Sequence, residues 1–456
     1  MTRSIHVRTA FVAITAAALL ATGMTAGSAP ASASTPTEVS GTLADATPYR
    51  FVVPERWNGT VFVELDFAAS TSVSGYVEHL LASGAAYGGT TRTVTGWDIA
   101  GAIDNQIEAL ERFEAAVGPA TRRIATGTSM GGFVAAGVAQ RRPGSIDGVA
   151  SFCGGLSGAV SQWNQKLDTV YTLSRLLDPD GALPVTGIPA DVAGSVSAWR
   201  AVLSEAQGTP EGRARIALAA AIGQLPAWAE SQPRPSPRDP DAYQAGWYGA
   251  LAGGGLPYIG QAMSSRRSLE TITGGNPSWN LGVDYRAQFA AASKQDRKVV
   301  ERLYRAAGLS LEEDLGIVDA GERIAADEAA VRQLEQGIEF DGALSVPVLT
   351  MSNIGDQIST VAQQDEYGDL VKAAGNGGLL RQIYVESVGH CAFSDAEKVA
   401  AVDVLLGRLD SGRWRSTSAA TLNRAAEATE LGEARFLRFT PDDFTRPYAP
   451  AVSPQV

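Results

Sequence analysis

The stretch ATGTSMGGFVA, residues 125–135, contains the pattern Gly127-x-Ser129-x-Gly131. This pattern is typical of a nucleophilic serine on a sharp turn between a strand and a helix. Because the chain has 49 glycines, the pattern alone is weak, and an ordinary serine in a glycine-rich turn is the alternative. The context favours the nucleophile, since "RRIAT" before the turn predicts a strand and "FVAAGVAQ" after it predicts a helix.

The residues around this turn, 40–155, alternate between the two kinds of element. Strand-like runs are "YRFVVP", "GTVFVELDF", "AAYGG", "RRIATGTS" and "IDGVASFCGG", and helical runs are "SGYVEHLLASG", "DIAGAIDNQIEALERFEAAVG" and "MGGFVAAGVAQRR". Strands that alternate with crossover helices predict a mostly parallel, doubly wound sheet covered on both faces. We therefore expect an α/β fold.

Further along, residues 156–341 lack strand-like runs and contain helical segments such as "ARIALAAAIGQL" and "DRKVVERLYRAAG". We interpret them as a helical insertion. The strand pattern resumes in residues 342–410, at "ALSVPVLTMSN" and "LLRQIYVESVGH", so the sheet is expected to be completed there. Residues 411–456 form a Pro-rich tail that we expect to be irregular.

A serine hydroxyl needs a base, and histidine is scarce in this chain. His6 lies in the N-terminal leader described below. His79 lies in a helical run, where a surface or packing role is expected. His390 follows the strand candidate "RQIYVESV" and a loop glycine, so it is expected at the carboxyl end of a strand, where α/β sheets place catalytic groups. His390 is therefore the candidate base, with a buried structural histidine as the alternative.

The acid that would orient this histidine is expected after another strand. Asp356 stands in the loop "NIGDQIST" after "SVPVLTM" and precedes His390, which gives the chain order Ser, Asp, His. Asp395 and Glu386 are competitors. Asp395 is interpreted as the cap of the following helix, and Glu386 lies within a strand.

Composition narrows the class of partner. A formal charge of −12 at pH 7 argues against nucleic acid and anionic membranes. The chain has two cysteines and widely separated histidines, which give no metal-ligand spacing, so no metal and no cofactor are expected. A small-molecule or polymeric ester substrate is the expected partner; the oligomeric state is left open.

The N-terminus, residues 1–33, has the features of a secretory signal peptide. Arg3 and Arg8 precede the apolar run "AFVAITAAALLA", and Ala31-Ser32-Ala33 suits a cleavage site. A membrane anchor is the alternative, but the run is shorter than the roughly 20 residues that a spanning helix needs. We expect a secreted, extracellular protein.

With these residues in view, the chain resembles a secreted α/β-hydrolase of the actinobacterial, serine esterase-like type with a helical cap insertion. The last strand and loop, "LLRQIYVESVGHCAF", carry much of the resemblance. It implies Ser129 as nucleophile, Asp356 as acid and His390 as base. Many members carry a His-Gly pair after the third strand as part of the oxyanion hole, but here the place reads "VFVELDFAAS". The donors expected here are the backbone N–H of Met130 and one backbone N–H from Leu65 to Phe67, with Asp66 and Phe67 as the candidates.

The two cysteines are expected on the same rim of the sheet, because Cys153 ends a strand and Cys391 follows His390. This predicts a Cys153–Cys391 disulfide that anchors the histidine loop, with two buried free cysteines as the alternative. The arrangement is similar in part to tannase and feruloyl esterase relatives, although Thr128 precedes the serine here.

The sequence thus predicts a cofactor-independent hydrolase that cleaves carboxylic esters through an acyl-enzyme. Two alternatives stay open: a secreted serine peptidase or aminopeptidase on the same fold, and a non-catalytic hydrolase-fold binding protein.

Overall fold

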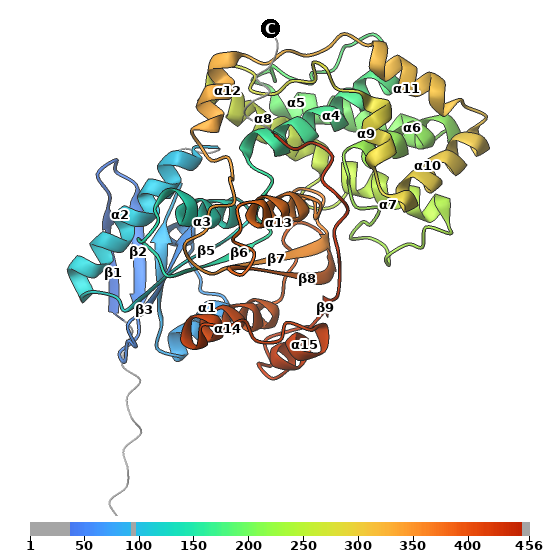
Figure 1. Ribbon diagram of the computed structural model, residues 1–456. Helices are drawn as coiled ribbons and strands as arrows, with labels where there is room; N and C mark the ends of the chain where they lie inside the picture. The colour runs from blue at the N-terminus through green and yellow to red at the C-terminus, as the bar shows by residue number, and fades with distance from the viewer. Residues whose placement is uncertain (1–36, 93–96, 449–456) are drawn as a thin grey trace, which may run out of the picture. The chain divides into compact units, whose positions relative to one another are not determined.

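The sheet is the organising layer of the computed structural model, which describes residues 37–92 and 97–448 (Figure 1). Nine strands in these residues form one sheet in the order β1-β2-β4-β3-β5-β6-β7-β8-β9. Their bounds are β1 Thr37–Thr42, β2 Pro48–Val53, β3 Thr60–Leu65, β4 Ala86–Thr90, β5 Arg122–Thr128, β6 Gly148–Phe152, β7 Val348–Gly355, β8 Leu380–Val388 and β9 Phe436–Leu437.

The pairing is mostly parallel. Strands β4, β3, β5, β6, β7 and β8 run in the same direction, while β1, β2 and β9 pair in the antiparallel sense at the edges. The central strands are buried on both faces, which explains why β6 (GVASF) and β7 (VLTMSNIG) contain small and apolar side chains with no charged residue.

Helices cover both faces of the sheet, as Figure 1 shows. One face carries α2 (Ile99–Val117), α3 (Met130–Arg141) and α13 (Gln363–Ala373), and the other carries α1 (Gly75–Ala82) and α14 (Asp395–Ser411). Each face has its own buried apolar cluster. Together with loops at the carboxyl ends of β5, β7 and β8 that carry Ser129, Asp356 and His390, this is the α/β-hydrolase fold, so the expected fold class is confirmed.

Nine helices between β6 and β7 form the layer at the top of Figure 1. They are α4 Ala159–Leu177, α5 Val192–Gln207, α6 Pro210–Ile222, α7 Pro240–Ala252, α8 Tyr258–Thr273, α9 Tyr285–Ala291, α10 Lys294–Ala307, α11 Leu311–Ala320 and α12 Glu328–Glu335. They fall within the range given above for the insertion, and many of their apolar side chains share a third buried cluster. Within the described residues, the sheet and this helical layer nevertheless belong to one compact unit.

The tail differs from the irregular segment that the sequence suggested. It contains α15 (Ala419–Glu427) and the short strand β9, which pairs with β8. Beyond β9 the chain runs up to the helical layer, where Arg446 Nε lies 2.7 Å from the buried Oδ2 of Asp168 in α4. The sequence does not predict this ordered tail for two reasons. Strand β9 is only two residues long, and Arg446 binds a partner that lies 278 positions away in the chain.

The predicted signal peptide, residues 1–33, lies outside the described residues. No helix in residues 37–92 and 97–448 has the length and apolar character needed to cross a bilayer.

Candidate active site

Ser129 occupies the turn between β5 and α3, with a left-handed φ of 58°. A side chain on Gly127 would place its Cβ 2.4 Å from the carbonyl carbon of Gly131, so the tightness of the turn requires glycine at position 127. The amide of Ser129 donates to Phe152 O at 2.9 Å, which fastens the turn to β6. A serine held at such an angle is strained, and it is exposed enough to react.

His390 and Asp356 complete a line of hydrogen-bonding groups. His390 Nε2 lies 2.7 Å from Ser129 Oγ, and His390 Nδ1 lies 3.0 Å from each carboxylate oxygen of Asp356. The side chain of His390 is 13% exposed and that of Asp356 is fully buried. A serine, a base on it and an acid behind the base is the arrangement required for an activated hydroxyl.

The loops that carry the acid and base are tied together. Asp356 Oδ1 accepts from the amides of Ile358 and Ser359 at 2.8 and 2.9 Å, and its Oδ2 accepts from the amide of Cys391 at 3.0 Å. Asn353 at the end of β7 donates to Gly389 O at 2.8 Å. The carboxylate is therefore held by three backbone donors as well as by the imidazole.

Cys153 and Cys391 form a disulfide that lies against the site. Cys153 Sγ is 3.3 Å from the amide nitrogen of Ser129, and Cys391 Sγ is 3.3 Å from His390 Nε2. The bridge thus touches both the serine turn and the imidazole, even though Cys153 is not adjacent to Ser129 in sequence.

The competing residues lie elsewhere. His79 is half-buried on α1 and does not line the cavity that contains Ser129. Glu386 on β8 pairs with Arg234 at 2.9 Å. Asp395 is the first residue of α14, but the cap is Ser394, which accepts from the amide of Glu397; the interpretation of Asp395 as the cap was wrong by one residue.

The segment expected to supply the second oxyanion donor turns sharply. Asp66 has a left-handed φ of 78°, and its carboxylate is bound by Arg92, with Nη2 2.6 Å from Oδ2. Phe67 packs its buried ring against Tyr87. Neither Asp66 nor Phe67 is among the residues that line the cavity with Ser129, whereas Met130 and Arg92 are. The charge of Asp66 is therefore matched by a neighbouring cation and not directed at the serine.

A cavity of about 310 Å³ opens over Ser129 and His390. Its lining includes Met130 and Phe133 of α3 and Ile358 of the loop after β7, together with Gln162 and Lys166 of α4 and Gln261 of α8. Two helices of the helical layer, α4 and α8, therefore supply part of the lining of this cavity.

Lys166 is the functional candidate that sequence reasoning missed. Its side chain is 2% exposed, and Nζ donates to Ile358 O at 2.7 Å. Burial lowers the pKa of Lys166 to about 8. The nearby charge of Arg266 also lowers this pKa, whereas the charge of Asp356 partly offsets the shift by raising it. The available signal was indirect: α4 is rich in polar residues yet is buried along nearly its whole length.

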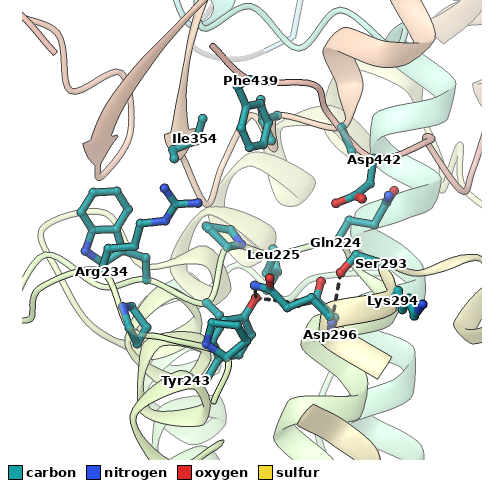
Figure 2. Close-up of a pocket in the computed structure, with 18 of the residues that line it drawn as sticks. Gln224, Leu225, Arg234, Tyr243, Ser293, Lys294, Asp296, Ile354, Phe439 and Asp442 are labelled. Carbon is teal, nitrogen blue, oxygen red and sulfur yellow. Dashed lines mark hydrogen bonds between the residues drawn. The ribbon is translucent and has the colours of Figure 1, made fainter. Parts of the chain in front are cut away.

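A larger cavity, about 540 Å³, lies apart from these residues (Figure 2). None of Ser129, Asp356 and His390 lines it. Figure 2 shows Tyr243 and Ser293 converging on Asp296, with Tyr243 Oη 2.7 Å from Asp296 Oδ1. Burial raises the pKa of Asp296 to about 6. Within the described residues, its lining places a tyrosine on a carboxylate but contains no serine or cysteine hydrogen-bonded to a histidine, so the smaller cavity is the candidate active site.

Potential metal ligands meet at one place in the described part of the chain, where Cys153, Cys391 and Asp356 are close together. Both sulfurs belong to the disulfide, so they offer no thiolate, and Asp356 is engaged by His390 and backbone amides. The group is accounted for without an ion.

Comparison with known proteins gives one relative of high coverage. No protein-family model matches the chain. The o-phthalyl amidase of Xanthobacter agilis is 35% identical over 432 residues, which cover 88% of this chain and 94% of the amidase. Among solved structures, an esterase from Aspergillus oryzae has 12% identity and a TM-score of 0.39, covering 82% of this chain and 79% of its own. Feruloyl esterase B from Aspergillus oryzae has 13% identity and a TM-score of 0.40, covering 83% and 81%.

Proposed function

Because the chain belongs to the family of the o-phthalyl amidase of Xanthobacter agilis and is a hydrolase, we propose that it hydrolyses carboxylic esters and amides through an acyl-enzyme on Ser129. The observation that carries the proposal is the 2.7 Å separation of Ser129 Oγ and His390 Nε2, with Asp356 on the other imidazole nitrogen.

In the first half of the reaction, Ser129 Oγ attacks the substrate carbonyl carbon while its proton passes to His390 Nε2. Asp356 fixes the Nδ1–H tautomer and stabilises the imidazolium. The tetrahedral intermediate then breaks its bond to the alcohol or amine, which takes the proton from Nε2. Water repeats these steps on the acyl-enzyme, releasing the acid and restoring Ser129.

The developing oxyanion requires backbone donors. Met130 is the first residue of α3 and lines the cavity, so its N–H belongs to the unpaired first turn of a helix and faces negative charge favourably. For the second donor we propose a backbone N–H of the turn at Asp66 and Phe67, directly after β3, although neither residue is among those that line the cavity.

An ester and an amide of the same acid share their acyl group. Both substrate types give the same acyl-enzyme, and they differ only in the leaving group. The ester reading follows from the sequence resemblance, while the name of the relative favours an amide of an aromatic acid. Trp97 and Phe133 line the cavity and could pack against an aromatic acyl group.

The place of action is proposed to be outside the cell. The N-terminal residues have the composition of a signal peptide, and the Cys153–Cys391 bridge suits an oxidising compartment.

The test is hydrolysis of matched 4-nitrophenyl esters and 4-nitroanilides of acetic and benzoic acids by the wild type, Ser129→Ala and Ser145→Ala. Ser145 lies in the turn after α3 and serves as the control for loss of a hydroxyl. We expect Ser129→Ala to lose at least about a thousandfold in kcat/KM while Ser145→Ala stays near wild type.

The ratio of kcat/KM for the esters to kcat/KM for the anilides separates the two activities: a higher value for the esters favours an esterase, and a higher value for the anilides favours an amidase. Equal residual activity in Ser129→Ala and the wild type would overturn the proposal. A wild type that is inactive on every one of these substrates would instead leave the non-catalytic binding protein as the better explanation.

A further inference from the structure

Resting on the proposed function, we propose that Lys166 binds a carboxylate carried by the acyl group of the substrate, beside the carbonyl that Ser129 attacks. The site would then select acids with a second, anionic group, such as 2-carboxybenzoyl derivatives.

The first support is where the ammonium lies. Lys166 is on α4, is almost fully buried, and lines the same 310 Å³ cavity as Ser129 and His390. A buried charge is costly unless it is paired. A cation in the wall of a catalytic cavity therefore favours a bound anion there.

The second support is its incomplete pairing. An ammonium has three donors. One donates to Ile358 O at 2.7 Å, and Nζ also lies 5.2 Å from the centroid of the Tyr258 ring. Within the described residues no carboxylate forms an ion pair with Nζ, so two donors are left for a ligand.

Other cations near the site are already engaged. Arg92 also lines the cavity, but its guanidinium binds both carboxylate oxygens of Asp66 at 2.6 to 3.0 Å. Arg266 is buried and donates to Trp163 O and to Ser278 Oγ. Lys166 is therefore the cation with donors to spare.

The rest of the cavity suits an aryl acid. The rings of Trp97 and Phe133 lie 5.9 Å apart, centroid to centroid, and both line the cavity. An aromatic acyl group between these rings and Lys166 would present its flat apolar face to the rings and its carboxylate to Lys166.

A purely structural role is the competing explanation. The acceptor of Lys166 is Ile358 O, and the amide of Ile358 donates to Asp356 Oδ1. Lys166 could therefore position the loop that holds the acid. A loss of positioning would slow every substrate alike, whereas a loss of carboxylate binding would slow only substrates that carry one.

The experiment compares two anilides of similar shape, N-(4-nitrophenyl)phthalamic acid and 2-methyl-4′-nitrobenzanilide, which replaces the carboxylate by a methyl group. The variants are Lys166→Met and Lys166→Gln, the second of which keeps a donor for Ile358 O. Lys372→Met removes an exposed lysine of α13 and is the control. The 3-carboxy isomer of the anilide tests the position of the anion.

We expect the wild type to prefer the 2-carboxy anilide, and both Lys166 variants to lose about 100-fold in kcat/KM for it, mainly through KM. For the methyl analogue the loss should stay below about threefold. Lys372→Met should behave as wild type.

Equal losses on both anilides, or a wild type that does not prefer the carboxylate, would overturn the assignment of Lys166 while leaving the acyl-enzyme proposal in place. A wild type inactive on these anilides and on all the simple esters would instead overturn the proposed function itself.

Discussion

The amide of Cys391 donates to Asp356 Oδ2 at 3.0 Å, so the residue that follows His390 is hydrogen-bonded to the carboxylate that His390 Nδ1 contacts. One backbone bond thus fixes the distance between two loops that follow different strands. The acid is held in the same way from its own side, by the amides of Ile358 and Ser359. The arrangement makes specific predictions about the site and about stability.

Asp356→Asn should lower kcat by about 10³ to 10⁴-fold, because an amide can donate to Nδ1 and so favours the wrong imidazole tautomer. Steady-state kinetics on 4-nitrophenyl acetate measure the effect. Glu386→Gln, which changes an exposed carboxylate on β8, is the matched control and should retain wild-type activity. Comparable losses in the two variants would argue against Asp356 as the acid.

Loss of the disulfide should destabilise the fold and slow the enzyme. The bridge spans 238 residues, for which the chain-entropy argument gives up to about 5 kcal/mol. Cys153→Ser/Cys391→Ser, compared with the wild type by thermal unfolding and ester turnover, should show a lower Tm and a lower kcat. Titration of the unfolded wild-type protein under non-reducing conditions should find no free thiol; two thiols would refute the bridge.

The activity toward carboxylated substrates should depend on pH through Lys166. Burial sets its pKa to about 8, with Asp356 opposing and Arg266 adding to the shift, and the ring of Tyr258 packs nearby. In the free enzyme, kcat/KM for the 2-carboxy anilide should therefore fall above about pH 8 as the ammonium loses its proton. The methyl analogue should show no such fall, and parallel profiles for the two anilides would contradict the expectation.

Lys166 should also reduce stability at neutral pH. Its pKa is lowered on folding, from 10.5 to about 8, so the unfolded chain holds a proton more firmly than the folded one. Unfolding free energy should therefore rise between about pH 8 and 10.5, by at most about 3 kcal/mol. Lys166→Met should be about 1–3 kcal/mol more stable than wild type at pH 7, less what the unpaired Ile358 O costs.

Urea unfolding at pH 7 and pH 10 measures that difference. The gap between Lys166→Met and wild type should narrow at the higher pH. A gap that widens there would mean that the lysine is stabilised by its surroundings and is not held at a cost.

Arg446→Ala should destabilise the protein by about 3 kcal/mol, because it leaves the fully buried Asp168 without its cation. Tyr285 and Gln288 would remain as neutral donors to that carboxylate. Urea unfolding measures the loss, and Arg424→Ala, on the exposed side of α15, is the control. No difference between the two variants would mean that the tail does not stabilise α4.

The sequence predicted the parts of this molecule that obey local rules. The alternation around residues 40–155 gave the central sheet, and the order Ser129, Asp356, His390 followed from three loops after three strands. The edges escaped prediction. Strand β9 is two residues long, and nothing in its own composition shows that it pairs with β8.

Lys166 escaped for a different reason. The run "SQWNQKLD" in α4 looks like a solvated helix face, but the helix is buried, and some of its polar side chains bind partners far away in sequence. Lys166, for example, donates to Ile358 O across 192 positions, and Asp168 meets Arg446 across 278 positions. Periodicity reports which residues share a face and not what covers that face.

The position of the Cys153–Cys391 bridge in the chain also limits when it can form during synthesis. It encloses every helix of the upper layer, α4 to α12, within the 238 positions between its ends. A nascent chain cannot close it until residue 391 has been made, well after the serine turn has left the ribosome. The covalent link between the serine turn and the histidine loop can therefore form only after the whole helical layer has been synthesised, and it requires an oxidising compartment.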